Sequence, residues 1–219
     1  MRRDLLRLAV IAALLIAAFA VAAGYYIKSE RIKKEQVAEK TRQETTLVFE
    51  RPHSRSLGPT DAKVTIVEFL DPECEACRAM YPIVKRLLAQ YEGRVRLVVR
   101  YMPFHPNSVY AAGVLEAAGE QGRYWEMLET LFQYQPQWGS HHAPRPDLIP
   151  SYAEQIGLDM QALETAVNAG AHKGLVEIDA ADGRALGVTA TPAFFVNGRP
   201  LGRLGYEPLR ALIDEELSK

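Results

Sequence analysis

The sequence predicts an α/β domain in which a strand–helix–strand unit is followed by a helical insertion, a β-hairpin and a closing helix. Three observations predict it. The β-branched run VTIVEFL at 64–70 leads directly into a helical pattern, residues 108–186 are mostly helical in periodicity, and Asn197-Gly198 is a strong hairpin turn between two apolar segments. With 219 residues, 48% apolar and 24% charged, the chain has enough residues for one such domain and an appendage.

The appendage is the N-terminal segment 1–27, which we interpret as a transmembrane anchor or a secretory signal. Basic residues precede an apolar run at 8–23 that continues to Ile27, and about 20 apolar residues span a bilayer core. As a signal peptide, the same segment would offer Ala20 and Ala22 as the small residues that signal peptidase needs. We favour the anchor, and in both cases we expect the rest of the chain to be exported.

Residues 28–60 are predicted to form a helical spacer and a linker ahead of the main domain at 61–219. The spacer, 28–44, is charged and free of Pro and Gly, whereas residues 45–60 contain several breakers and are expected to be irregular. Residues 45–219 hold 17 Lys and Arg against 22 Asp and Glu. A nucleic-acid binder is therefore excluded, because phosphate neutralisation needs clustered cations.

Within the main domain, the order of elements follows from hydrophobic spacing and from breakers. After the first strand, residues 74–91 have apolar positions at helical spacing and Gly93 closes the helix, and 94–101 is a second strand. The insertion, at about 108–186, has helices predicted at 109–121, 123–133, 147–156, 160–168 and 172–186, with a loop rich in Pro, His and Trp near 135–150. The hairpin strands are 193–196 and 199–203, and the closing helix is 208–217.

The two cysteines of the chain lie together in Cys74-Glu75-Ala76-Cys77, after the first strand and at the start of the helix. Unpaired backbone N–H groups and the helix dipole stabilise a thiolate at the first cysteine. The second, three residues on, is close enough to close a disulfide. Redox use is the favoured interpretation. The alternatives are an inert bridge or half of a zinc site, although zinc would need two further Cys or His ligands at paired spacing.

The sequence resembles the DsbA-like thiol-disulfide oxidoreductases of the thioredoxin-like superfamily. The residues that carry the resemblance are VEFLDPECEAC at 67–77, the helical insertion, and Thr191-Pro192 before AFFVNGRPL at 193–201. The resemblance covers about 61–219 and implies a thioredoxin-like fold with a helical insertion. It further implies that Pro192 is cis and lies beside the cysteines, and that the backbone of Thr191 pairs with an extended substrate peptide. An ordinary strand start is the alternative for this dipeptide.

Glu68 matches the buried acidic residue of that family, six positions before Cys74. A carboxylate buried within an apolar strand is costly, and its pKa should rise by desolvation. The resemblance then implies that Glu68 exchanges a proton with Cys77. In the alternative, strand alternation points Glu68 to solvent.

Glu73 and Glu75 are departures from the family's pattern. The dipeptide between the cysteines is Glu75-Ala76, whereas strong oxidants of the family often carry His there, and Glu73 directly precedes Cys74. Two nearby carboxylates oppose thiolate formation, and Arg78 offsets them in part. We therefore expect a pKa for Cys74 less depressed than the family extreme of about 3.5, and a milder oxidant.

Three histidines are further candidates. His141 and His142 could belong to a metal site or to the peptide groove, but adjacent histidines point apart, so we expect a surface loop. His105 follows the second strand, and its approach to the active site is the less favoured interpretation. We expect no metal and no bound organic cofactor.

The predicted function is an extracytoplasmic thiol-disulfide oxidoreductase, on the periplasmic side of the inner membrane, that oxidises protein thiols through a Cys74–Cys77 disulfide. The resemblance implies reoxidation by a DsbB-like membrane partner. The same residues also run as a reductase or isomerase, because direction depends on potential. A copper(I) metallochaperone that uses the cysteines remains a third possibility, since copper(I) prefers soft thiolates.

Overall fold

The computed structural model describes residues 23–37 and 48–219. The chain divides into two units, 1–47 and 48–219. Residues 23–37 are helical, so the described part of the predicted spacer is a helix, with Arg31 and Glu35 paired at 3.3 Å. The predicted anchor or signal segment falls mainly on 1–22, outside the described residues. Among the residues that are described, no helix has both the length and the apolar character needed to cross a membrane.

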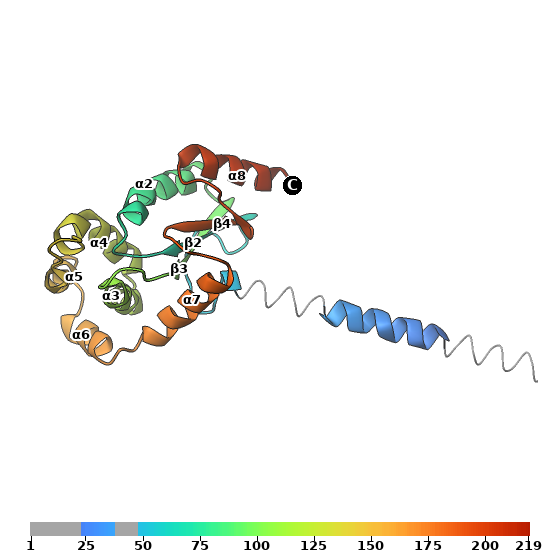
Figure 1. The fold of residues 1–219 in the computed structure, drawn as a ribbon, viewed down its shortest axis with the longest axis horizontal. Helices are drawn as coiled ribbons and strands as arrows, with labels where there is room; N and C mark the ends of the chain where they lie inside the picture. Colours follow the sequence, from blue (N-terminus) through green and yellow to red (C-terminus); the bar gives the residue numbers. More distant parts are fainter. Residues whose placement is uncertain (1–22, 38–47) are drawn as a thin grey trace, which may run out of the picture. The chain divides into compact units, whose positions relative to one another are not determined.

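The second unit is built on a five-stranded mixed sheet (Figure 1). Across the sheet the strands are β1 (Arg55–Leu57), β3 (Val95–Tyr101), β2 (Val64–Leu70), β4 (Ala193–Val196) and β5 (Arg199–Pro200). The central pair, β2 and β3, is parallel, and the other neighbouring pairs are antiparallel. Both central strands are almost fully buried, as their near-continuous apolar sequences predict.

Helices cover both faces of this sheet and form a lobe at one end. In Figure 1, α2 (Glu75–Gln90) and α8 (Tyr206–Ser218) lie on one side of the sheet and α7 (Lys173–Ala185) on the other. The lobe contains α3 (Ser108–Glu120), α4 (Tyr124–Trp138), a short 3₁₀ turn (Pro146–Leu148), α5 (Ile149–Gln155) and α6 (Met160–Asn168). The thioredoxin-like fold with a helical insertion is thus confirmed.

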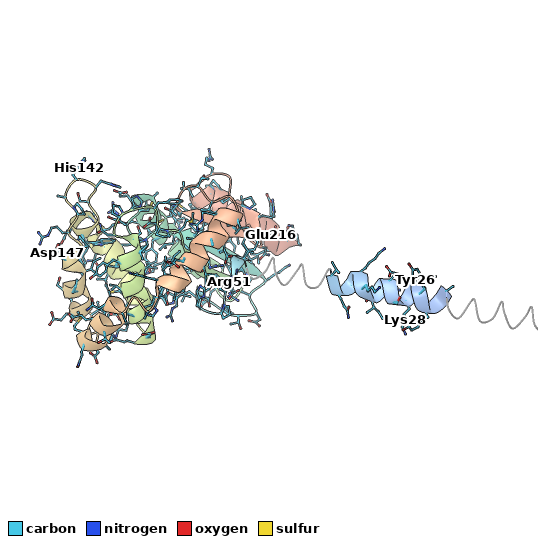
Figure 2. The ribbon with its side chains drawn as sticks, turned by 60° about the horizontal axis from the view of Figure 1, so that its bottom comes forward. Tyr26, Lys28, Arg51, His142, Asp147 and Glu216 are labelled. Carbon is cyan, nitrogen blue, oxygen red and sulfur yellow. The ribbon has the colours of Figure 1, made fainter. Side chains whose placement is uncertain are left out.

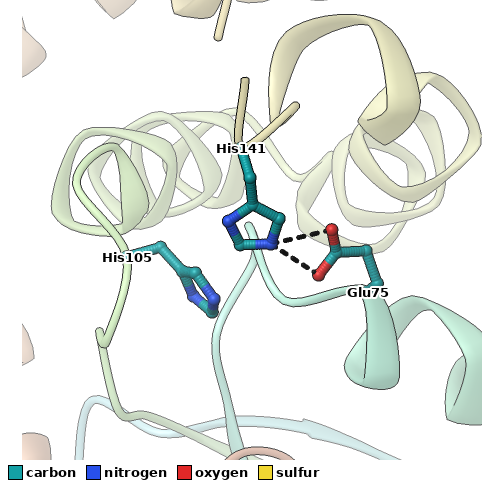
Figure 3. Close-up of side chains that lie close together, drawn as sticks. All are labelled: Glu75, His105 and His141. Atoms are coloured by element: carbon teal, nitrogen blue, oxygen red, sulfur yellow. Dashed lines mark hydrogen bonds and ion pairs between the residues drawn. The ribbon is translucent and has the colours of Figure 1, made fainter. Parts of the chain in front are cut away.

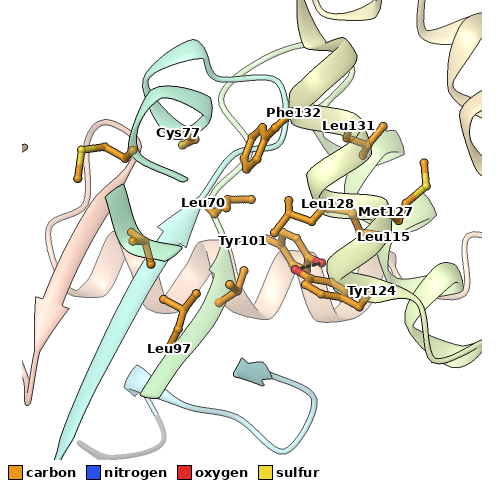
Figure 4. Packing of buried hydrophobic residues seen from close by; sticks show 14 of the residues in the cluster. Leu70, Cys77, Leu97, Tyr101, Leu115, Tyr124, Met127, Leu128, Leu131 and Phe132 are labelled. Carbon is orange, nitrogen blue, oxygen red and sulfur yellow. Dashed lines mark hydrogen bonds between the residues drawn. The ribbon is translucent and has the colours of Figure 1, made fainter. Parts of the chain in front are cut away.

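The larger core lies between the sheet, α2 and the helical lobe. Alternate residues of β2, including Ile66 and Leu70, face this core, and Cys77 enters it from α2. Figure 4 shows Leu70, Cys77 and Phe132 close together at this junction. By the same alternation Glu68 shares the α2 face of the strand, which excludes the solvent-facing alternative for its side chain.

The opposite face of the sheet packs on α7 around Phe69. Gly183 of α7 allows this close approach, because a Cβ there would lie 3.0 Å from the Phe69 ring and from the Met102 sulfur. Beside this core, the fully buried guanidinium of Arg100 binds Asp179 at 2.7 Å and Asp182 at 2.5 Å.

Arg51, labelled in Figure 2, adds a second guanidinium to Asp182 at 2.8 Å. These ion pairs fasten the start of the folded unit to α7. His53, two residues further on, reaches Asp179 at 2.8 Å and extends the same network.

Three local predictions differ from the structure. Residues 55–57, expected to be irregular, form edge strand β1, because pairing with β3 rather than hydrophobic alternation specifies so short a strand. Helix α4 runs five residues past its predicted end and through Pro136, which buries Trp138 completely and lets its indole N–H bind the Leu131 carbonyl at 2.8 Å. The hairpin's return strand comprises two residues instead of five.

Candidate active site

Cys74 and Cys77 lie where β2 passes into α2. Cys74 is the N-cap of α2, with extended backbone, and it is 7% exposed. Cys77 lies one turn into the helix and is fully buried. Both are free thiols, and the Cys77 sulfur accepts the backbone N–H of Asp71 at 3.5 Å. A substrate therefore meets Cys74 first.

The Thr191–Pro192 segment faces Cys74 across the site. Its peptide bond is cis, as the resemblance implied, and Pro192 is buried. The Cys74 sulfur lies 3.3 Å from the Thr191 carbonyl oxygen. The structure thus brings together two segments separated by more than a hundred residues, as the sequence analysis expected.

The two thiols differ strongly in acidity. Hydrogen bonding from the Cys77 thiol lowers the pKa of Cys74 to about 5, against the effect of burial. A hydrogen bond with the Thr191 side chain and the backbone N–H groups of Cys77 and Ala76 lower it further. Burial raises the pKa of Cys77 far above its ordinary value. The pKa of Cys74 lies above the extreme of about 3.5 found in such proteins, in line with the sequence-based expectation.

Glu68 is buried beneath this pair. Its side chain is 1% exposed, and its Oε1 has no hydrogen-bond partner among the described residues. Desolvation, followed by the negative charge of Cys74, raises the pKa of Glu68 to about 8. The charge of Glu68 in turn contributes to the raised pKa of Cys77. A carboxyl group with this pKa changes protonation near neutral pH, and the proton transfer between Glu68 and Cys77 stays a prediction.

Asp71 organises the loop around the cysteines, and the sequence analysis did not identify it. Its buried carboxylate accepts hydrogen bonds from the backbone N–H of Glu73 at 2.9 Å, from that of Phe104 at 2.7 Å, and from the Ser108 hydroxyl. The signal for this role was an acidic residue placed directly after a buried strand. Asp71 links the β2–α2 junction to the segment that follows β3.

Glu73, in the same junction, and Gln135, in helix α4 of the lobe, tie the junction to its neighbours through hydrogen bonds. Glu73 is 3% exposed, and its two oxygens accept the backbone and side-chain N–H groups of Asn107, both at 2.7 Å. Gln135 donates to the carbonyl oxygens of Pro72 and Cys74 at 2.9 and 3.0 Å. Gln135 was missed because helix α4 was expected to end before it. Both oxygens of the Glu73 side chain are thus held by Asn107, which fixes the position of this carboxyl group next to Cys74.

Glu75 is paired as well. His141 Nε2 lies 2.9 Å from its carboxylate, and this hydrogen bond holds the pKa of Glu75 below its usual value. The sequence analysis placed His105 away from the site, but the centroid of its ring lies 5.3 Å from that of His141, with the two rings tilted by 55° (Figure 3). The approach of His105 is due to Asp71, whose carboxylate lies 2.7 Å from His105 Nδ1. His142 is exposed in the surface loop, as expected.

Comparisons with known proteins agree with this geometry. Residues 50–215 match a family model described as Thioredoxin. Among curated relatives, a Na(+)/H(+) antiporter NhaA of Herminiimonas arsenicoxydans is 34% identical over 90% of this chain, and NhaA 3 of Salinispora tropica is 40% identical over 68%. The chain spans only 31% and 22% of the length of these two relatives.

Solved structures with the same fold include a thioredoxin-like oxidoreductase from Silicibacter pomeroyi, at 27% identity and a TM-score of 0.68. Oxidised BdbD from Bacillus subtilis follows at 24% identity and a TM-score of 0.71. For both, the match covers 78% of this chain and 96% of the other. The thiol-disulfide exchange protein α-DsbA2 from Wolbachia pipientis is 20% identical, with a TM-score of 0.68 over 84% and 97% of the two chains. The chain therefore belongs to the thioredoxin family and has the fold of the DsbA-like thiol-disulfide oxidoreductases.

Proposed function

We propose that this protein catalyses thiol-disulfide exchange with protein thiols, and that it acts mainly as an oxidant. The observation that carries the proposal is the position of the Cys74 sulfur, at the first turn of α2 and 3.3 Å from the Thr191 carbonyl, with Cys77 buried behind it. This arrangement offers one accessible sulfur for attack and one protected sulfur for resolution.

In the oxidising direction, a substrate thiolate attacks the Cys74 sulfur of the Cys74–Cys77 disulfide. A bond forms between the substrate sulfur and Cys74, the Cys74–Cys77 bond breaks, and its electron pair leaves on Cys77. The high pKa of Cys77 means that this thiolate takes up a proton at once, and neutral Glu68 is placed to supply it. A second substrate thiolate then attacks the mixed disulfide, which forms the substrate disulfide and releases the Cys74 thiolate.

The extended substrate chain would pair with the backbone of Thr191 beside Pro192. The Thr191 carbonyl already lies against Cys74, so a peptide held along this segment would bring its own sulfur to the reactive one. Recognition through backbone groups places few demands on the substrate's side chains and suits a protein that accepts many clients.

The acidity of Cys74 supports the oxidising direction. A thiol whose pKa is lowered to about 5 is a good leaving group and stabilises the reduced form of the protein, which makes its disulfide the stronger oxidant. Reductase or isomerase activity uses the same residues at a different potential. Equilibration of the pair with glutathione decides between these directions: a potential near −270 mV, typical of reducing thioredoxins, would contradict the proposal.

We place this activity on the extracytoplasmic side of the inner membrane, with a DsbB-like membrane protein as the reoxidant. The apolar N-terminal segment supports export or anchoring, and the names of the curated relatives, which are membrane antiporters, support a membrane-associated setting. Mass spectrometry of the exported protein tests the anchoring part of this proposal, because it reports whether residues 1–27 are retained.

The direct test is to trap clients. Replacement of the resolving cysteine, Cys77→Ser, should accumulate mixed disulfides between Cys74 and substrate proteins, and the matched Cys74→Ser variant should trap none. Wild-type protein should also accelerate refolding of a reduced, disulfide-containing substrate. If Cys77→Ser traps nothing while the protein retains copper(I) in a 1:1 ratio through dialysis, the metallochaperone is the correct function.

A further inference from the structure

Beside the cysteine pair, three potential metal ligands converge from separate segments of the chain. Glu75 begins α2, His105 lies between β3 and α3, and His141 lies in the loop after α4 (Figure 3). One ligand atom from each lies within 4.8 Å of the other two. Neither cysteine belongs to this group.

The ring of His105 has the kind of carboxylate partner that histidine ligands of metal ions usually have. Asp71 Oδ2 lies 2.7 Å from its Nδ1, and the buried carboxylate is itself held by the Phe104 backbone N–H. A carboxylate on Nδ1 keeps the proton on that nitrogen, so Nε2 presents its lone pair outward. This carboxylate–histidine arrangement is the outer-shell support that metal sites use to fix the ring and raise its basicity.

The local charge also favours a cation. Three carboxyl side chains, those of Asp71, Glu73 and Glu75, lie in this region, and Arg78 is the nearby cation that lines the same surface hollow as Glu75 and His141. That hollow has a volume of 330 Å³, enough for an ion with coordinated water. An excess of negative charge around two imidazoles lowers the cost of holding a dication.

We propose that Glu75, His105 and His141 bind a divalent transition-metal ion of the Zn²⁺ class at the mouth of the redox site. Two imidazoles and one carboxylate are a donor set that Zn²⁺ accepts with a water in its fourth position. Tetrahedral ligands lie about 3.3 Å apart, given Zn–N and Zn–O bonds of about 2.0–2.1 Å. Glu75 and His141 are each about half exposed, so their side chains have room to adjust toward that spacing.

The proposed ligands differ from the adjacent pair, His141 and His142, that the sequence analysis considered for a metal site. Neighbouring His141 and His142 do not share an ion; His141 instead joins a histidine from a distant loop. The sequence analysis expected no metal, because it found no paired ligand spacing. The spacing is absent because each ligand comes from a different element, and only the folded chain brings the three together.

The test uses the full-length chain with both cysteines replaced, Cys74→Ser/Cys77→Ser, so that thiolates cannot bind the metal. Zn²⁺ is titrated in competition with a chromophoric chelator. We expect 1:1 binding, and a loss of at least about tenfold in affinity on adding either His141→Gln or His105→Gln, since even outer-shell changes cost tenfold or more. The matched control is His142→Gln, which removes an exposed imidazole of the same loop (Figure 2) and should leave the affinity unchanged.

Three results would overturn this site. Binding that disappears with the cysteines assigns the metal to the thiols, equal losses for His141→Gln and His142→Gln indicate a nonspecific surface histidine, and no 1:1 binding at all removes the site. None of these results bears on disulfide exchange, because the cysteine-free protein measures binding alone.

Discussion

Two buried charged groups on neighbouring strands of one sheet have opposite surroundings. On β3, Arg100 is fully buried and binds both Asp179 and Asp182. On β2, Glu68 is equally buried, yet its Oε1 has no partner in the described part of the chain and its pKa is raised to about 8. The Arg100 side faces α7, and the Glu68 side faces the cysteines.

This difference helps to distinguish a buried ionisable residue that stabilises the fold from one that takes part in a reaction. A buried ion whose partners satisfy it holds elements together, here the start of the folded unit and α7. A buried group without a partner destabilises the fold when it ionises, so its presence requires another use. We interpret Arg100 as structural and Glu68 as a proton carrier, and four predictions test that contrast.

The largest effect is expected from Arg100→Met. This change should lower the free energy of unfolding by about 3 kcal/mol, because it removes the fully buried partner of Asp179 and Asp182 and leaves them only the partly exposed Arg51 and His53. Chemical denaturation measures it. The control is Arg145→Met, which removes an exposed pair with Asp147 and should leave the free energy of unfolding almost unchanged. Equal losses in both variants would contradict the structural interpretation of Arg100.

The next effect concerns the rate of exchange. Glu68→Gln should slow disulfide exchange at pH 7 by about a hundredfold, because an amide cannot deliver a proton to Cys77. The free energy of unfolding should not fall, since the amide carries no charge to desolvate. Stopped-flow fluorescence with a model peptide gives the rate. Glu129→Gln, an exposed carboxyl paired with Lys85, is the control and should exchange at the wild-type rate.

The raised pKa of Glu68 also predicts how stability depends on pH. Between its ordinary pKa of 4.5 and about 8, the folded state retains a proton that the unfolded state has lost. The stability due to the neutral carboxyl is therefore complete below pH 4.5 and is lost as pH rises through 8. Relative to wild type, Glu68→Gln should gain stability progressively over this window in denaturation series. A constant difference between the two proteins from pH 4 to 9 would show that Glu68 is not buried as described.

The smallest of the four effects is the acidity of Cys74. In reduced protein freed of metal by a chelator, alkylation by iodoacetamide should reach half its maximal rate near pH 5, below the 8.5 of a free cysteine. The stabilisation of the folded state by this thiolate is complete at high pH and is lost as pH falls through 5. A hydrogen bond with the Thr191 side chain contributes to this low pKa, so Thr191→Ala should move the midpoint upward, toward the ordinary value of a cysteine. A midpoint above 8 would exclude the thiolate as the resting form.

The central fold was predictable because its signals are local. The strand at 64–70 has the predicted bounds, since a β-branched run closed by Asp71-Pro72 leaves little freedom. The glycines that end the insertion's helices, such as Gly122 and Gly157, adopt positive φ, and side chains disfavour this conformation. By contrast β1 forms only because β3 is there to pair with it.

The residues of the candidate site also fall into those that a local sequence pattern indicates and those that depend on tertiary contacts. Cys74, Cys77 and Glu68 could be chosen as candidates from the sequence because one short segment carries all three. Asp71, Gln135 and His105 act through contacts between segments 34 to 63 residues apart, which no local pattern encodes. Hydrogen bonds of this kind follow from tertiary packing, so they become visible only in the folded chain.

The shortness of β5 has a consequence for how this edge of the sheet meets other extended chains. Pro200 has no N–H to offer at this sheet edge, and Arg199 is held by Glu215 and Glu216 at 2.9 and 2.8 Å. An edge with a proline and a fixed charge is a poor template for an added strand. Strand addition is therefore disfavoured at the β5 edge of the sheet.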